Sequence, residues 1–296
     1  MTNKIKKYWP SSLIMLAVGL TAGLFIYASY GKIFGRKHPP ALALSLTAAQ
    51  KAAALPLAPS SDSLRLPILM YHHIGDAPPD ADATRKDLTV STQAFQSQVS
   101  WLAKQGYQSI RLEDLYLYSR GQFQLPAKPI IFTFDDGYSD VFDNAVPVLK
   151  QAGFFGSFGI ITDYPKLTGP NLLNGNSYAS WQQIGQAAAA GNEIVSHTEN
   201  HFDGSDPKFD DTYIFNNLSG SRQSLYDHLA LKTNVLIYPY GHYSATYLEQ
   251  AKKAGFSLGV TVREGQEIKL DDLMELPRLR VHGGEDLAKF IEILKG

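Results

Sequence analysis

The chain has 296 residues, of which 44% are hydrophobic and none is cysteine. Structural disulfides, thiolate catalysis, cysteine-ligated zinc and a lipoprotein anchor are therefore excluded. The 27 basic residues nearly balance the 28 acidic ones, but six of the basic residues lie within the first 37 positions. Without these six the chain is clearly acidic, and a body of that sign is a poor partner for nucleic acid.

An uncharged, apolar run extends from Ser11 to Tyr30. Twenty such residues suffice to cross a bilayer as a helix. A cleaved signal peptide is the competing interpretation, but Ala28-Ser29-Tyr30 does not supply a small-x-small cleavage site. We therefore predict a cytoplasmic stub and transmembrane anchor over 1–37, a linker rich in Ala, Pro and Ser over 38–63, and a folded domain over 64–296. We expect a single-pass protein of the cell membrane whose folded domain is extracellular. If the anchor is cleaved, the domain would be secreted.

Strand and helix patterns alternate through the predicted domain. Repeated strand–helix units indicate parallel strands with helices outside, and seven strands favour a distorted (β/α)7 barrel. The predicted strands are 66–71, 130–134, 158–161, 193–196, 235–238, 257–261 and 276–281. The predicted helices are 91–105, 139–152, 181–190, 215–229, 244–254 and 287–294.

Polar residues follow several of these strands. Asp135 and Asp136 close the second strand, where a carboxylate is costly unless it is paired or binds a metal, although acid-acid-Gly is also a common turn. His197 and His201, four residues apart, share one face if they lie on a helical turn; a chance surface pair is the alternative. Two histidines and one carboxylate leave coordination positions open, as in a catalytic metal site. His282 follows the last strand, where a structural histidine is the alternative.

Four motifs together resemble the polysaccharide deacetylases of the NodB-homology type, carbohydrate esterase family 4, over about residues 66–294. The motifs are Thr133-Phe134-Asp135-Asp136-Gly137-Tyr138, His197-Thr198-Glu199-Asn200-His201, Pro239-Tyr240-Gly241 and Leu279-Arg280-Val281-His282.

This resemblance implies roles for the site residues. Asp136, His197 and His201 would bind a divalent metal, usually Zn²⁺, with Co²⁺, Ni²⁺ or Mn²⁺ as other occupants. Asp135 would be the general base and His282 the general acid.

The third motif implies further contacts. The backbone N–H of Tyr240 would stabilise the oxyanion, and Tyr138, Pro239 and Tyr240 are the predicted substrate-binding residues. The expected partner is an N-acetylated polysaccharide, with no obligate protein partner.

Two departures from the family pattern narrow the substrate. Ile237 stands where the family often has an arginine that orients the base, so Arg278 or Arg280 is expected to replace it, and the family's Asp-x-x-Asp-Trp run is absent. With His72-His73 near the first strand, these departures resemble the branch that deacetylates poly-β-1,6-N-acetylglucosamine. The alternatives are a peptidoglycan N-deacetylase, an O-deacetylase, or a non-catalytic glycan-binding protein on the same fold.

Overall fold

The computed structural model describes residues 62–295, apart from 167–170 and 174–175. The predicted anchor and linker over 1–63 therefore lie almost entirely outside the described residues. Among the helices that are described, none is both long and apolar enough to span a bilayer.

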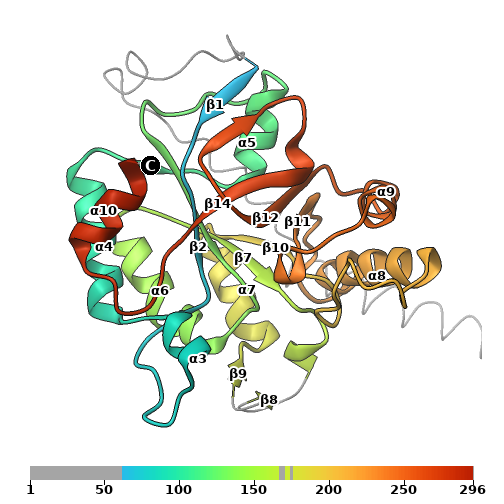
Figure 1. Ribbon diagram of the computed structural model, residues 1–296, viewed down its shortest axis with the longest axis horizontal. Helices are drawn as coiled ribbons and strands as arrows, with labels where there is room; N and C mark the ends of the chain where they lie inside the picture. The colour runs from blue at the N-terminus through green and yellow to red at the C-terminus, as the bar shows by residue number, and fades with distance from the viewer. Residues whose placement is uncertain (1–61, 167–170, 174–175, 296) are drawn as a thin grey trace, which may run out of the picture. The chain divides into compact units, whose positions relative to one another are not determined.

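Seven parallel strands close into a barrel (Figure 1), which confirms the predicted (β/α)7 fold. The ring closes because β2 pairs on one side with β14 and on the other with β6. In order around the barrel the strands are β2 (Ile68–Tyr71), β14 (Leu276–Arg280), β12 (Leu258–Glu264), β11 (Val235–Ile237), β10 (Glu193–Ser196), β7 (Ser157–Ile160) and β6 (Pro129–Phe134). An eighth strand, β5 (Gln108–Ser109), was not predicted and extends the sheet beyond β6.

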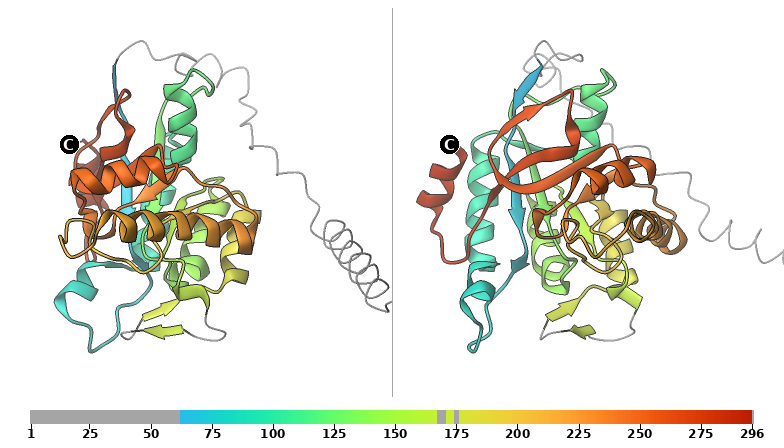
Figure 2. Two further views of the ribbon diagram at one scale, coloured as in Figure 1. Left: turned by 90° about the vertical axis from the view of Figure 1, so that its right-hand side faces the viewer. Right: turned by 45° about the vertical axis from the view of Figure 1, so that its right-hand side comes forward.

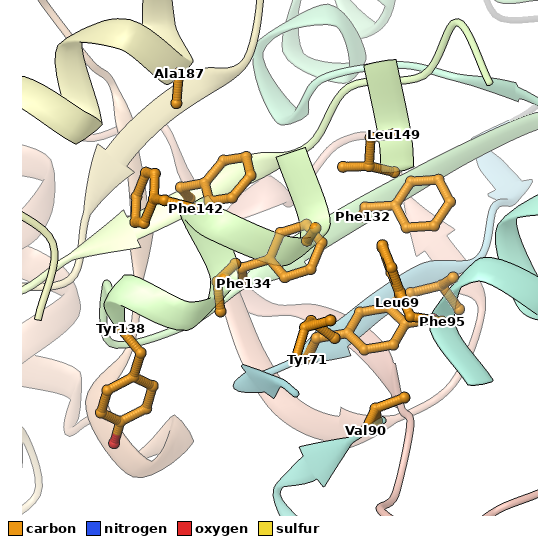
Figure 3. Packing of buried hydrophobic residues seen from close by; sticks show 14 of the residues in the cluster. Leu69, Tyr71, Val90, Phe95, Phe132, Phe134, Tyr138, Phe142, Leu149 and Ala187 are labelled. Carbon is orange, nitrogen blue, oxygen red and sulfur yellow. The ribbon is translucent and has the colours of Figure 1, made fainter. Parts of the chain in front are cut away.

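Alternate residues of the strands supply two different hydrophobic cores. Phe132 and Phe134 of β6 point outward and pack with the helices (Figure 3). Phe158 of β7 stacks on Phe134, with ring centroids 4.8 Å apart. Ile131, whose side chain lies on the other side of β6, belongs to a second cluster inside the barrel with Ile68 and other inward-facing strand residues. This period of two follows from the pleat of a strand. Because both faces are buried, the strands read in the sequence as nearly continuous apolar runs.

The helices surround the barrel, and each contacts the next around it in the order α10, α4, α6, α7, α8 and α9. They are α4 (Thr92–Lys104), α6 (Ser139–Gln151), α7 (Trp181–Ala189), α8 (Asp211–Leu229), α9 (Ala245–Lys253) and α10 (Leu287–Lys295). Five of the six lie within two residues of their predicted bounds. The prediction for α8 began four residues late because Asp210, whose side chain accepts from the amide of Tyr213, is the true N-cap.

Short elements that the sequence did not predict cover the two ends of the barrel. At the amino end, β1 (Ser63–Arg65) pairs with β13 (Glu267–Lys269), and α5 (Leu112–Ser119) packs under the strands. At the carboxyl end lie α3 (Ala83–Asp87), the pair β3 (His73–Ile74) and β4 (Thr89–Val90), and the pair β8 (Asn171–Leu173) and β9 (Asn176–Tyr178). Figures 1 and 2 show α3 and β9 at the same end. Active residues of parallel barrels lie at this carboxyl end.

Candidate active site

Asp136, His197 and His201 meet at the carboxyl end of the barrel. The Oδ1 atom of Asp136 lies 3.1 Å from Nε2 of His197 and 3.2 Å from Nε2 of His201. One ligand atom from each residue falls within 4.8 Å of the other two, and the group is largely buried. Two imidazole nitrogens and one carboxylate oxygen suit a divalent transition metal and leave positions open for water and substrate.

The backbone bends sharply where these residues leave their strands. Asp136, Thr198 and His201 all have positive φ, at 71°, 68° and 60°. Residues 197–201 are not helical, and a bend at Glu199 and Asn200 takes the place of the helical turn that would have put the two imidazoles on one face. The hydroxyl of Thr198 accepts the amide of His201 at 2.9 Å, which closes the bend and turns His201 back toward His197.

Hydrogen bonds prepare this group for a cation. The Nδ1 atom of His197 donates to the carbonyl of Ile237 at 2.8 Å, so Nε2 is the ring nitrogen that faces Asp136 and would bind a cation. Burial alone would raise the pKa of Asp136, but the hydrogen bonds from His197 and His201 hold that pKa well below its usual range. Asp136 is thus an anion, as a metal ligand must be.

Asp135 points into the barrel and pairs with Arg278. The guanidinium donates from Nη1 to Oδ1 at 2.7 Å and from Nη2 to Oδ2 at 2.8 Å. Arg278 also donates to the hydroxyl of Thr133 at 2.9 Å and to the carbonyl of Thr261 at 2.7 Å, and its side chain has no exposed surface. Burial would raise the pKa of Asp135, yet Arg278 lowers it overall. Of the two arginines named from the sequence, Arg278 is therefore the one that orients this carboxylate.

His282 lies at the same end of the barrel. Its neighbour Val281 donates to the carbonyl of Met70 at the end of β2, and the Nε2 atom of the nearby His72 lies 3.9 Å from Asp135. The Nδ1 atom of His282 is 2.9 Å from Oδ1 of Asp87. Sequence reasoning missed Asp87, because the end of a five-residue polar helix carries no pattern that marks it as functional.

Tyrosines border the group on its exposed side. Tyr240 is 55% exposed, has a φ of 59°, and places its ring 4.5 Å from that of His201. Pro239 is buried and begins the short 3₁₀ turn that carries Tyr240. Tyr138 is largely buried, and its ring packs against those of His73 and Tyr178. Of the three predicted substrate-binding residues, Tyr240 is thus the most open to a ligand.

Comparisons with known proteins identify the domain. Residues 123–259 match the family model described as polysaccharide deacetylase. The chain carries a polysaccharide deacetylase domain. This match confirms the family and the enzyme class that the sequence predicted, a polysaccharide N-deacetylase. The matched region contains Asp135, Asp136, His197, His201 and Tyr240 but ends before the last strand.

Relatives and a solved structure support the match. YxkH of Bacillus subtilis (strain 168) is 27% identical over 237 residues, which cover 78% of this chain and 77% of YxkH. The poly-beta-1,6-N-acetyl-D-glucosamine N-deacetylase of Escherichia coli (strain K12) is 24% identical over 76% of this chain, but the match spans only 38% of that enzyme. The Streptococcus pyogenes deacetylase PplD, solved with acetate, has a TM-score of 0.70 at 26% identity and is matched over 99% of its length and 79% of this chain.

Proposed function

We propose that this domain is a metal-dependent hydrolase that removes N-acetyl groups from N-acetylglucosamine units of an extracellular or cell-wall polysaccharide. One observation carries the proposal. A carboxylate locked by a buried arginine, Asp135, stands next in the chain to a carboxylate that faces two imidazoles, Asp136. A glycan-binding protein has no need for a second, separately oriented acid beside a metal site.

The chain's own residues divide the work of amide hydrolysis. A divalent cation held by Asp136, His197 and His201 would supply Lewis acidity to the acetyl carbonyl and to the attacking water. Arg278 occupies one edge of the Asp135 carboxylate, so the remaining lone pairs of Asp135 accept the proton that the water loses. The water oxygen forms the new bond to the carbonyl carbon.

The second half of the reaction needs an oxyanion donor and an acid. We assign the backbone N–H of Tyr240 as the donor to the oxyanion. Asp87 accepts the Nδ1 proton of His282, which leaves Nε2 to carry the proton that the departing sugar amine receives as the carbon–nitrogen bond breaks. The products are acetate and a free amine.

Poly-β-1,6-N-acetylglucosamine is the substrate that we favour. Support comes from the name of the E. coli relative and from the absence of the usual third-motif arginine, whose place on the base Arg278 takes. Free amines would change how such a glycan adheres to anionic surfaces, as in a biofilm. We further propose that residues 1–37 anchor the domain outside the cell membrane, on the basis of the apolar run from Ser11 to Tyr30.

Acetate release tests the activity and the substrate together. Purified protein is incubated with poly-N-acetylglucosamine, peptidoglycan and chitin oligomers, with chelator and after return of Zn²⁺ or Co²⁺. We expect release from the first polymer, loss of release with chelator, and recovery with metal. Release from peptidoglycan alone would replace the favoured substrate with the alternative one.

The variant Asp135→Asn, which keeps the shape of the side chain but removes its charge, tests the assignment of Asp135 as the general base. It should bind metal normally and release no acetate, and full activity in this variant would refute the assigned base. Protease treatment of intact cells that express the full chain tests the location, since an outward-facing domain is degraded and a cytoplasmic one is protected.

A further inference from the structure

The loop 197–201 carries two of the three candidate metal ligands, so its backbone sets the distance between the two imidazoles. His197 still belongs to the sheet, since its amide donates to the carbonyl of Ile160 at 2.9 Å. His201 lies beyond the strand, and both Thr198 and His201 have positive φ. Such conformations persist only where neighbouring groups hold them in place. The position of the second imidazole therefore depends on what holds the loop.

The segment that follows β7 holds this loop through its carbonyls. The amide of Thr162 donates to the carbonyl of Thr198 at 3.1 Å, and the amide of Asp163 donates to the carbonyl of Glu199 at 2.9 Å. The amides of Thr198 and Glu199 still require acceptors, because a buried backbone N–H without a partner is costly.

The helix α8 supplies the acceptor for the amide of Glu199. The Oδ1 atom of Asn217 accepts this amide at 2.9 Å, and Asn217 is only 3% exposed. Because a backbone N–H can only donate, this bond fixes the orientation of the Asn217 amide, whose Nδ2 donates to Oδ1 of Asn200 at 2.9 Å. The Nδ2 atom of Asn200 then donates to the hydroxyl of Tyr213, one turn earlier in α8. Asn217 thus bonds two successive residues of the loop.

The next turn of α8 reaches the amide of Thr198. The hydroxyl of Ser221 donates its one proton to the carbonyl of Leu218 at 2.9 Å, so its oxygen accepts from the hydroxyl of Ser196 at 2.7 Å. The oxygen of Ser196 accepts the amide of Thr198 at 3.1 Å. Both serines are fully buried. Two successive amides of the loop are therefore tied to side chains one turn apart on α8.

The sequence of α8 suits this contact better than it suits helix formation. Asn217, Gly220 and Ser221 are three or four residues apart and share one face of the helix, although all three are weaker helix formers than alanine. An added Cβ at Gly220 would lie 2.1 Å from Oε1 of Glu199, so the glycine lets the loop approach the helix closely. A face that only filled space against the barrel would be served better by alanine or leucine.

We infer that Asn217 is a positioning residue for the metal ligands His197 and His201, and that Ser221 assists it through Ser196. Asn217 acts by fixing the backbone that joins the two imidazoles. This inference rests on the proposed function, since it requires a cation at the two histidines and Asp136. Groups that orient metal ligands without binding the metal change its affinity by about 10- to 100-fold.

Cobalt titration of the metal-free protein, followed by visible absorption, measures the effect without relying on activity. We expect Asn217→Leu to weaken Co²⁺ binding by about 10-fold, because the side chain keeps its size but loses both bonds to the loop. Ser221→Ala acts one contact further out and should weaken Co²⁺ binding by about 3-fold.

Asn192→Leu is the matched control. Asn192 is also buried, and its amide also makes two bonds, since Oδ1 accepts the amide of Gly156 and Nδ2 donates to the carbonyl of Ala187, both at 3.0 Å. It lies at the amino end of β10, the end opposite His197. This change should lower stability in urea much as Asn217→Leu does, but it should leave Co²⁺ affinity unaltered.

The possible results separate this inference from the proposed function. If the unmodified protein binds no Co²⁺, the proposed metal site fails and the inference fails with it. If the unmodified protein binds Co²⁺ and folded Asn217→Leu binds it equally tightly, only the positioning role fails. If Asn192→Leu weakens binding as much as Asn217→Leu, the loss reflects general stability, and the positioning role also fails. If Asn217→Leu does not fold, Ser221→Ala decides, since unchanged affinity in that variant overturns the inference and weaker affinity supports it.

Discussion

Replacement of Arg278 by methionine tests the central contact of the site. Arg278 makes four hydrogen bonds, two of them to Asp135, and its side chain has no exposed surface. Removal of the guanidinium leaves the Asp135 carboxylate, which is 3% exposed, as an uncompensated buried charge. Breaking a buried ion pair from one side typically costs about 3–5 kcal/mol. We expect the free energy of unfolding of Arg278→Met to fall by that amount at pH 7.

The double variant Arg278→Met/Asp135→Asn identifies the source of the loss. With the carboxylate charge gone, the remaining cost is mainly the loss of the hydrogen bonds that the guanidinium donates to the hydroxyl of Thr133 and the carbonyl of Thr261, about 1–2 kcal/mol. Urea denaturation measures the free energy of unfolding of both variants, and the comparison holds if the dependence of that free energy on urea concentration is unchanged. If the double variant loses as much as the two single variants combined, the pair is not coupled and our account of Arg278 is wrong. Activity of Arg278→Met should also fall by at least about 100-fold, because the base is no longer oriented.

Three further variants probe the site and its support. Asp87→Asn should lower kcat by about 10- to 100-fold with little change in KM, measured by acetate release, because His282 loses its charged orienting partner. Gly283→Ala should destabilise the fold by about 1–3 kcal/mol in urea and lower kcat, since a Cβ there would lie 1.9 Å from the carbonyl oxygen of Lys86 and push α3 away. Glu193→Gln should flatten the pH dependence of stability. Burial raises the pKa of Glu193 from 4.5 to about 7, so between these values the folded state holds a proton that the unfolded state has lost. Stability should therefore fall as pH rises from about 4.5 to 7, by about 3 kcal/mol. A variant that keeps the same slope would exclude Glu193 as its origin.

The barrel could be predicted from the sequence because its strands are buried on both faces. Runs such as Ile130–Phe134 are therefore apolar throughout and stand out from the helix patterns between them. Elements held by polar contacts gave no such signal. The helix α3 has no buried residue, and the β3–β4 pair is two residues long on each side. Asp87, the residue by which α3 contacts His282, was missed for that reason.

The choice between Arg278 and Arg280 shows where sequence reasoning stopped. Both have the parity of Leu276, which belongs to the inner cluster of the barrel. Register separates them: Arg280 lies level with Met70, which pairs with Thr133, so Arg278 starts two residues deeper. Two strand residues rise about 6.6 Å, so Arg278 begins about that far below Thr133, and its guanidinium contacts Thr133 and Asp135 together. Arg278 can thus reach Asp135 from below while it remains fully buried.

Backbone strain connects the site residues to one another. Asp136, Thr198, His201 and Tyr240 account for four of the five described non-glycine residues with positive φ. Each such conformation costs on the order of 1 kcal/mol and persists only where the surroundings hold it in place. For Asp136 those surroundings are the two imidazoles, whose Nε2 atoms lie 3.1 and 3.2 Å from its carboxylate. Asp135 continues the extended strand into the barrel, since its φ is not positive. The positive φ of Asp136 turns the chain at that residue, so the Asp136 side chain leaves the barrel interior. The sharp change in direction between the two residues gives adjacent acids separate partners, a buried guanidinium for one and a metal-ligand cluster for the other.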